Sequence, residues 1–165
     1  MSEQTQNLAE RCLERCSTLL TALRPCTEDE WQARPTGDAR TLGMIMHHIA
    51  GAYLANIDLI TAILNGQPVP SMFQDTAALD RWNAEYAEQH KGCARTETIA
   101  LLEECSTRAA QFIRGLSDEQ LRKTGDYPLL VLWFGAPPTV AQLVDSMLIS
   151  HPDRHLPDIR TVCAG

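Results

Sequence analysis

The sequence predicts an all-α protein in which four long helices form a four-helix bundle, joined by short connecting helices. Four long segments repeat apolar residues at spacings of three and four, which is the pattern of a helix with one buried face. No segment shows a convincing alternation of apolar and polar residues, the pattern of a half-buried strand. Amphipathic helices bury their apolar faces against one another, which favours a bundle. A length of 165 residues fits a single domain over 1–165.

The first long helix is expected over residues 5–24, and it ends before Pro25. A short helix should follow. Its start is marked by Thr27 and Glu30, which form a capping box in which the two side chains bond to free backbone amides. This short helix is expected to stop near Pro35.

The second long helix is expected over residues 40–64, and Asn65 and Gly66 mark its C-terminal end. His48 lies at the edge of the core face, whereas His47 points almost the opposite way. The apolar or small residues of that face, together with one asparagine, are Leu42, Ile45, Ile49, Ala52, Asn56, Leu59, Ile60 and Ile63.

A shorter helix is expected over residues 75–90, followed by the third long helix over 95–114. Gly115 ends this third helix, and a capping box formed by Ser117 and Gln120 opens another short one. The side of the 75–90 helix that carries apolar residues presents Leu79, Trp82 and Tyr86. The tryptophans of the chain are interpreted as packing residues rather than as a ligand cage.

Residues 128–134 are interpreted as a short extended segment laid over the bundle, because Pro137 and Pro138 prevent its continuation as a helix. Thr139 and Gln142 form a further capping box that opens the last long helix. The core row of this helix is Val140, Leu143, Val144, Met147, Leu148, His151, His155, Ile159 and Val162.

The composition excludes two classes of partner. The formal net charge is −7 and no cluster of lysines occurs, so nucleic acid is not an expected partner. The longest apolar run is too short to span a bilayer, and the polar, acidic start differs from a signal peptide. A soluble, cytoplasmic protein is therefore expected. The six cysteines contain no CxxC motif and are interpreted as thiols, several of them buried.

Three histidines form a candidate metal site. His151 and His155 are four residues apart in one apolar row, so two imidazoles one turn apart could converge on one ion. His48 could join them from the second long helix. A single histidine on an apolar face is more often a core or boundary residue with satisfied hydrogen bonds. Pro152 and Pro157 also leave open whether the last helix is continuous, and a break would free the two histidines from sharing a face.

Three segments resemble the DinB/YfiT-like four-helix bundles, a family described as metalloenzymes. LGMIMHHIA, from Leu42 to Ala50, is similar to the family's second helix with its metal-binding histidine, and LISHPDRHL, from Leu148 to Leu156, is similar to its last-helix HxxxH. The stretch TEDEWQARP, from Thr27 to Pro35, is similar to the turn that precedes the second helix.

This resemblance implies an up-down-down-up bundle that forms a homodimer and holds a divalent metal through His48, His151 and His155. It also implies chemistry on a small-molecule substrate by a metal-activated thiol or water. Characterised relatives include transferases and isomerases that use a low-molecular-weight thiol, and hydrolases. Zinc, nickel and iron(II) all accept imidazole ligands, so the metal stays open.

The first functional hypothesis is accordingly a metal-dependent transferase, isomerase or hydrolase. Its catalytic residue is undetermined. Asp158, on the ideal helical face of His151, is a candidate that could be a fourth ligand, a hydrogen-bond partner of a ligand or a base, or equally a solvated aspartate. Tyr53, Asn56 and Arg154 are candidates for substrate binding. The alternatives are a non-catalytic bundle that binds a metal or small ligand in stress response, and a structural dimer whose histidines are remnants.

Overall fold

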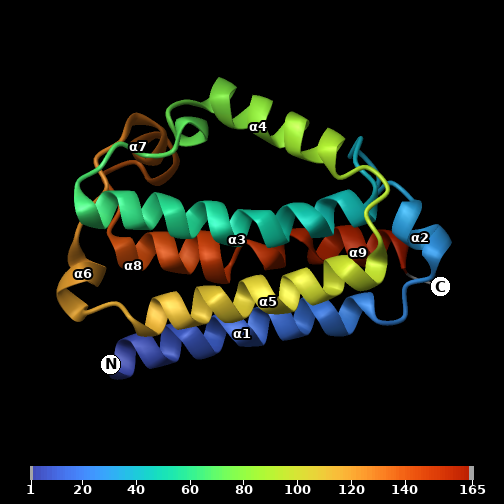
Figure 1. The fold of residues 1–165 in the computed structure, drawn as a ribbon, viewed down its shortest axis with the longest axis horizontal. Helices are drawn as coiled ribbons and strands as arrows, with labels where there is room; N and C mark the ends of the chain where they lie inside the picture. The colour runs from blue at the N-terminus through green and yellow to red at the C-terminus, as the bar shows by residue number, and fades with distance from the viewer. Residues whose placement is uncertain (1, 164–165) are drawn as a thin grey trace.

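The computed structural model describes residues 2–163 (Figure 1). Within this range every regular element is helical, and the sole β-bridge is an isolated one between Thr124 and Thr139. The predicted all-α class is confirmed. The long helices are α1 (Glu3–Leu23), α3 (Leu42–Asn65), α4 (Thr76–Gln89) and α5 (Arg95–Arg114). The short helices between them and after them are α2 (Glu28–Gln32), the 3₁₀ turn η1 (Ser71–Phe73), α6 (Asp118–Arg122) and α7 (Pro128–Phe134).

A bundle is formed by α1, α3, α5 and the C-terminal segment 140–162. The pair α1 and α5 and the pair α3 and α5 make the most extensive contacts, and the C-terminal segment packs on α1 and α3. In Figure 1, α1 and the C-terminal segment run in one direction, while α3 and α5 run in the other. Helix α4 lies along the outer side of α3, away from α1 (Figure 1). The core is a continuous cluster of aliphatic side chains, alanines and cysteines, with Trp31 and Tyr53 as its largest members.

The helix starts follow the local sequence chemistry. All three predicted capping boxes form, at Thr27 with Glu30, Ser117 with Gln120 and Thr139 with Gln142. Each satisfies backbone amides that the first helical turn leaves without partners. Helix α3 ends at Gly66, whose φ of +63° is accessible to glycine at little cost.

Residues 128–134 form helix α7, so the prediction of an extended segment was wrong. Pro128 occupies the first helical position, where its missing N–H costs nothing and its fixed φ suits a helix. Gly135 then ends the helix with a φ of +76°. The proline pair at 137 and 138 lies beyond this end and therefore does not oppose it.

The C-terminal segment is not the single helix that was predicted. It consists of four consecutive pieces, namely α8 (Val140–Leu143), the π-helix η2 (Val144–Ile149), the 3₁₀ helix η3 (Pro152–His155) and α9 (Leu156–Val162). The π-helix ends with a bond from Ser150 N to Asp145 O of 2.8 Å, five residues back. Pro152 cannot donate to the preceding turn, and it starts η3 instead. The segment nevertheless keeps one general direction across the break (Figure 1).

A disulfide joins Cys26 to Cys163, which corrects the interpretation of all six cysteines as thiols. The two Cα atoms are 5.4 Å apart although 137 positions separate the residues. No local motif predicts such a pair, because the two cysteines meet only when the bundle brings the end of α9 next to the connection between α1 and α2. The remaining four cysteines are free, and Cys12 and Cys16 are buried in the core.

Candidate metal centre

His48, His151 and His155 meet between α3 and the C-terminal segment. One ring nitrogen from each lies within 4.8 Å of the others. The ring centroids are separated by 5.5 Å for His48 and His151, 5.2 Å for His151 and His155, and 6.2 Å for His48 and His155. Three imidazole nitrogens at such spacing can share one divalent ion, with a further coordination position left for water or substrate. The structure thus brings together the three histidines singled out in the sequence.

The break in the C-terminal segment does not separate the last two of these histidines. His151 is the residue immediately before η3 and His155 is its last residue, so one compact turn spans the pair. The turn is closed by a bond of 3.2 Å from Arg154 N to His151 O. In a 3₁₀ helix, residues three apart lie almost directly above one another, which places position 154 above His151. His155 is the next residue after that position. The chelating arrangement therefore does not depend on a continuous α-helix.

The three imidazoles are in an environment that favours their neutral form. Burial lowers the pKa of His48 to about 4, and the nearby positive charge of Arg40 acts in the same direction. Burial and the neighbouring histidines hold the pKa of His151 well below its ordinary value of 6.5. Burial also lowers the pKa of His155, although its contact with Asp158 opposes this. Because a neutral ring is the form that binds a metal, the donor set suits a divalent cation at neutral pH.

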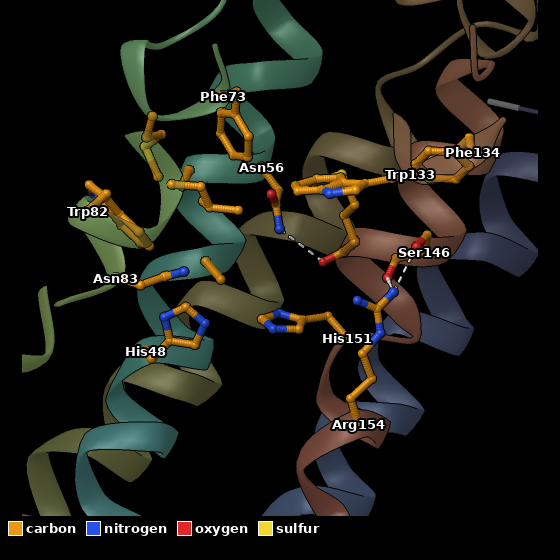
Figure 2. Close-up of a pocket in the computed structure, with 15 residues that line it drawn as sticks. His48, Asn56, Phe73, Trp82, Asn83, Trp133, Phe134, Ser146, His151 and Arg154 are labelled. Carbon is orange, nitrogen blue, oxygen red and sulfur yellow. Dashed lines mark hydrogen bonds between the residues drawn. The ribbon is translucent and has the colours of Figure 1, made fainter. Parts of the chain in front are cut away.

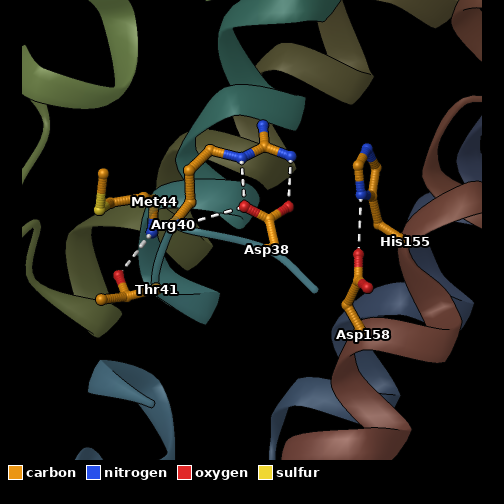
Figure 3. A network of polar contacts seen from close by, with 6 residues as sticks. All are labelled: Asp38, Arg40, Thr41, Met44, His155 and Asp158. Carbon is orange, nitrogen blue, oxygen red and sulfur yellow. Dashed lines mark hydrogen bonds and ion pairs between the residues drawn. The ribbon is translucent and has the colours of Figure 1, made fainter. Parts of the chain in front are cut away.

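Asp158 contacts His155 rather than the shared centre of the cluster. Its Oδ2 lies 3.0 Å from His155 Nδ1 (Figure 3). With the Nδ1–H donating to the carboxylate, Nε2 is the nitrogen that carries the free lone pair. Carboxylates commonly orient metal-binding histidines in this way. The Asp158 carboxylate thus lies against His155 and is not among the donor groups that meet in the cluster.

An ion pair between Asp38 and Arg40 faces this contact from the loop before α3 (Figure 3). Arg40 Nη2 lies 2.7 Å from Asp38 Oδ2 and its Nε lies 3.0 Å from Oδ1. The hydrogen bond from Arg40 lowers the pKa of Asp38. The sequence analysis missed this pair. A short Asp-x-Arg stretch just before the N-cap Thr41 is the only signal, and such stretches are common in loops.

A cavity of about 430 Å³ adjoins two of the three histidines (Figure 2). It lies between α3 and α4 on one side and α7, η2 and η3 on the other. Its lining consists of His48, Ala52, Ala55, Asn56, Met72, Phe73, Leu79, Trp82, Asn83, Trp133, Phe134, Ser146, Met147, His151 and Arg154. A volume of this size is typical of sites for small organic ligands. Any ion held by the histidines would therefore border a space large enough for a substrate.

Two of the three residues suggested for substrate binding line this cavity. Asn56 does so while donating from Nδ2 to Met147 O at 3.1 Å, and Arg154 does so near the outer edge, where its side chain is exposed. Trp82 and Trp133 also form part of the wall, which the packing interpretation of the tryptophans did not foresee. The pattern of apolar residues cannot distinguish a wall from a core, since both need the same side chains.

Tyr53, the third suggested residue, does not line the cavity. Its side chain is 2% exposed and faces the core thiols of Cys12 and Cys16. Its hydroxyl has no hydrogen-bond partner among the described residues. Position 53 is five residues from His48, and this offset turns the side chain from the cavity toward α1 and α5.

Helix α4 is attached to α3 beside the cluster by His47, Tyr86 and His90. The Tyr86 hydroxyl lies 2.9 Å from His47 Nδ1 and 3.3 Å from the His47 carbonyl oxygen. The rings of His47 and His90 stack with their centroids 3.9 Å apart. These contacts fix the helix that supplies Trp82 and Asn83 to the cavity.

A second group of potential ligands, Cys26, Glu30 and Cys163, also has its donor atoms within 4.8 Å of one another. The two sulfurs of this group are bonded to each other, so neither is a thiolate that could hold an ion. Among the described residues, the histidine cluster is thus the arrangement best suited to a metal.

Comparison with protein families matches residues 13–159 to the model of the DinB superfamily. The chain belongs to the DinB superfamily. The matched range contains all three histidines of the cluster and every residue that lines the cavity. No curated protein matches this DinB-superfamily chain. In the part of the chain that the structure describes, no helix is both long and apolar enough to cross a membrane.

Proposed function

We propose that this DinB-superfamily protein is a divalent-metal-dependent enzyme that acts on a small molecule. The reaction class is a transfer or isomerisation that uses a low-molecular-weight thiol, or a hydrolysis. The observation that carries the proposal is the position of the histidine cluster, with His48 and His151 in the wall of the 430 Å³ cavity. Zinc, nickel or iron(II) fits three neutral imidazoles. When bound, such an ion lowers the pKa of a coordinated water or thiol and so supplies a nucleophile near neutral pH.

The residues of the chain have separate tasks in this proposal. His48, His151 and His155 hold the ion, and Asp158 keeps the His155 ring oriented through Nδ1. The apolar wall, in which Trp82 and Trp133 have the largest side chains, excludes water from a bound substrate. Asn56 and Arg154 offer polar groups that orient it. No carboxylate or thiol of the described residues lines the cavity, so the coordinated group itself acts as the nucleophile.

The same lack of a carboxylate or thiol among the described lining residues favours a second candidate, a non-catalytic protein that binds a metal or a small ligand in stress response. The homodimer and the cytoplasmic location expected from the sequence remain proposals as well. The side chains of Leu132 and Trp133 are 70% and 44% exposed to solvent. They give α7 an apolar surface that a second copy of the chain could cover.

Elemental analysis of the untagged protein, purified without chelator, is the first test. We expect near-stoichiometric divalent metal in the wild type and its loss in His48→Ala and His151→Ala. His90→Ala serves as the matched control, because His90 lies at the end of α4 outside the cluster, and it should retain the metal. A wild-type protein that takes up no metal even after loading would reject the proposal.

Turnover separates the enzyme from the binding protein. The metal-loaded protein is incubated with candidate low-molecular-weight thiols and a panel of electrophiles, and separately with hydrolysable substrates. Rates above those of a variant with all three histidines changed to alanine support catalysis. Rates equal to that variant, with stoichiometric metal bound, favour the non-catalytic role.

A further inference from the structure

The cavity beside the histidine cluster carries positive charge although the chain as a whole is acidic. The formal net charge of the protein is −7. Of the lining residues in the described chain, only Arg154 has a side chain with a permanent formal charge. A divalent ion on the histidines would add to this positive charge. The electrostatics of the cavity therefore select an anionic ligand.

Arg154 is held in a position that suits recognition of a carboxylate. Its Nη2 lies 2.9 Å from Ser146 Oγ and 3.3 Å from Ser146 O, which anchors one edge of the guanidinium group (Figure 2). Its Nε and Nη1 make no hydrogen bond to any described residue. A guanidinium group that is fixed on one edge and free on another can present two parallel N–H donors to a carboxylate.

Asn83 supplies a second polar group that lacks a partner within the protein. Its Oδ1 is buried and accepts no hydrogen bond from any described residue. The side chain lines the cavity next to His48, across from His151 and Arg154 (Figure 2). Because the buried Oδ1 is closed to a ligand, the amide nitrogen is the group that Asn83 presents to the cavity: it points toward the middle (Figure 2) and can donate a hydrogen bond to a ligand oxygen.

Most of the other lining residues are apolar, and four of them are aromatic. Trp82 and Trp133 stand on opposite sides of the cavity, and Phe73 and Phe134 close its upper part (Figure 2). Aromatic walls of this kind favour a planar, largely apolar ligand body. A role in the wall also gives a reason for the 44% exposure of Trp133, which packing alone does not require.

From these features we propose that the cavity binds a small aromatic carboxylate that also carries a hydroxyl group. The carboxylate pairs with Arg154, the planar body lies between Trp82 and Trp133, and the hydroxyl oxygen accepts a hydrogen bond from Asn83 Nδ2. The inference rests on the proposed function in that it names the substrate class of the same site.

Three matched probes test this assignment by titration calorimetry. They are a hydroxynaphthoate, the uncharged amide of the same compound, and the naphthoate that lacks the hydroxyl group. Each is titrated into chelator-treated and into metal-loaded protein. The chelator-treated form is essential, because a carboxylate can also bind a metal directly. We expect the hydroxynaphthoate to bind roughly tenfold or more tightly than its amide in both forms.

Two variants assign the effect to the two side chains. Arg154→Gln should remove the preference for the carboxylate over the amide in chelator-treated protein. Arg160→Gln, which changes an exposed arginine on α9 outside the cavity, should keep it. Asn83→Leu should remove the advantage of the hydroxynaphthoate over the naphthoate while leaving the carboxylate preference intact.

Equal affinity for the carboxylate and the amide in the wild type overturns the inference. So does a preference that survives in Arg154→Gln without metal, and so does the absence of binding by all three probes at millimolar concentration. Failure of the proposed function is a different result. Selective carboxylate binding with no turnover rejects the enzyme and keeps the ligand class, whereas turnover of uncharged substrates without any carboxylate preference does the reverse.

Discussion

The Nδ1 atom of His155 lies 3.0 Å from Oδ2 of Asp158, and this contact joins the end of η3 to the first turn of α9. Both side chains are largely shielded from solvent, with exposures of 15% and 28%. Pro157 lies between the two residues at the start of α9 and fixes the backbone there. The contact therefore sets which ring nitrogen of His155 faces the cluster.

Asp158→Asn should weaken metal binding by about ten- to a hundredfold without unfolding the protein, because the amide orients the ring less strongly and contributes no charge. Metal affinity is measured by competition with a chromogenic chelator, and helicity by circular dichroism. Asp126→Asn is the control, since Asp126 is exposed and makes no side-chain hydrogen bond or ion pair to a described residue. Equal affinity in the two variants would show that Asp158 does not position His155.

Most of the helical framework was predictable because it depends on local signals. The 95–114 helix matches α5 at both ends, and the predicted ends of α1, α3 and α4 differ from the observed ones by one or two residues. Periodicity and capping boxes carry this information within a few residues of each position. The approach of His151 to His155 was predictable for a related reason, because a compact turn still brings together residues three or four apart. His48 lies on another helix, and its place in the cluster was expected from the resemblance of its segment to the second helix of the DinB-like family.

The remaining features depend on contacts between distant parts of the chain. The disulfide of Cys26 with Cys163, and the position of the Asp38–Arg40 ion pair opposite His155, depend on how distant segments pack. Helix α7 was missed because the prolines at 137 and 138 were given more weight than Pro128, which suits a helix start. Tyr53 and Asn56 both lie on α3, but only the packing of neighbouring helices decides which one borders the cavity.

The stability of the metal-free protein should fall as the pH is lowered below 7. The pKa of His48 is about 4 in the folded state and about 6.5 when the chain is unfolded, so between these values only the unfolded state takes up the proton. Above pH 6.5 the contribution of neutral His48 to the free energy of unfolding is fully present. Below pH 6.5 this contribution falls by about 1.4 kcal/mol for each pH unit, until the pH reaches the pKa of the folded state. Urea unfolding of chelator-treated protein at pH 8, 7, 6 and about 5 measures the slope.

His48→Gln isolates this contribution, because glutamine does not titrate. The variant should show a shallower dependence of unfolding free energy on pH than the wild type, by about 1.4 kcal/mol per unit. Parallel curves for the two proteins would mean that His48 is protonated in the folded state as readily as in the unfolded one.

Gly51→Ala should weaken the packing of α4 against α3. A Cβ atom at position 51 would lie 2.5 Å from Tyr86 Cζ and 2.8 Å from Cε2, which is closer than van der Waals contact permits. Tyr86 would have to move and lose its hydrogen bond to His47. We expect a loss of about 1–3 kcal/mol in unfolding free energy. In a Tyr86→Ala background the same change should cost much less, and an equal cost in both backgrounds would locate the strain elsewhere.

Cys163→Ser should destabilise the protein by about 2–4 kcal/mol, because the disulfide to Cys26 closes a very long loop in the unfolded chain. Adding a thiol reductant to the wild type should lower its stability to that of the variant, whereas the variant itself should not respond. Cys93→Ser, which changes a partly exposed free thiol, is the control and should remain as sensitive to reductant as the wild type.

Metal affinity is measured on the same samples. Helix α9 carries Asp158 and ends beside Cys163, so loss of the crosslink should also weaken the hold on His155. Unchanged stability and unchanged metal affinity after reduction would show that the packing of Ile159 alone keeps α9 in place.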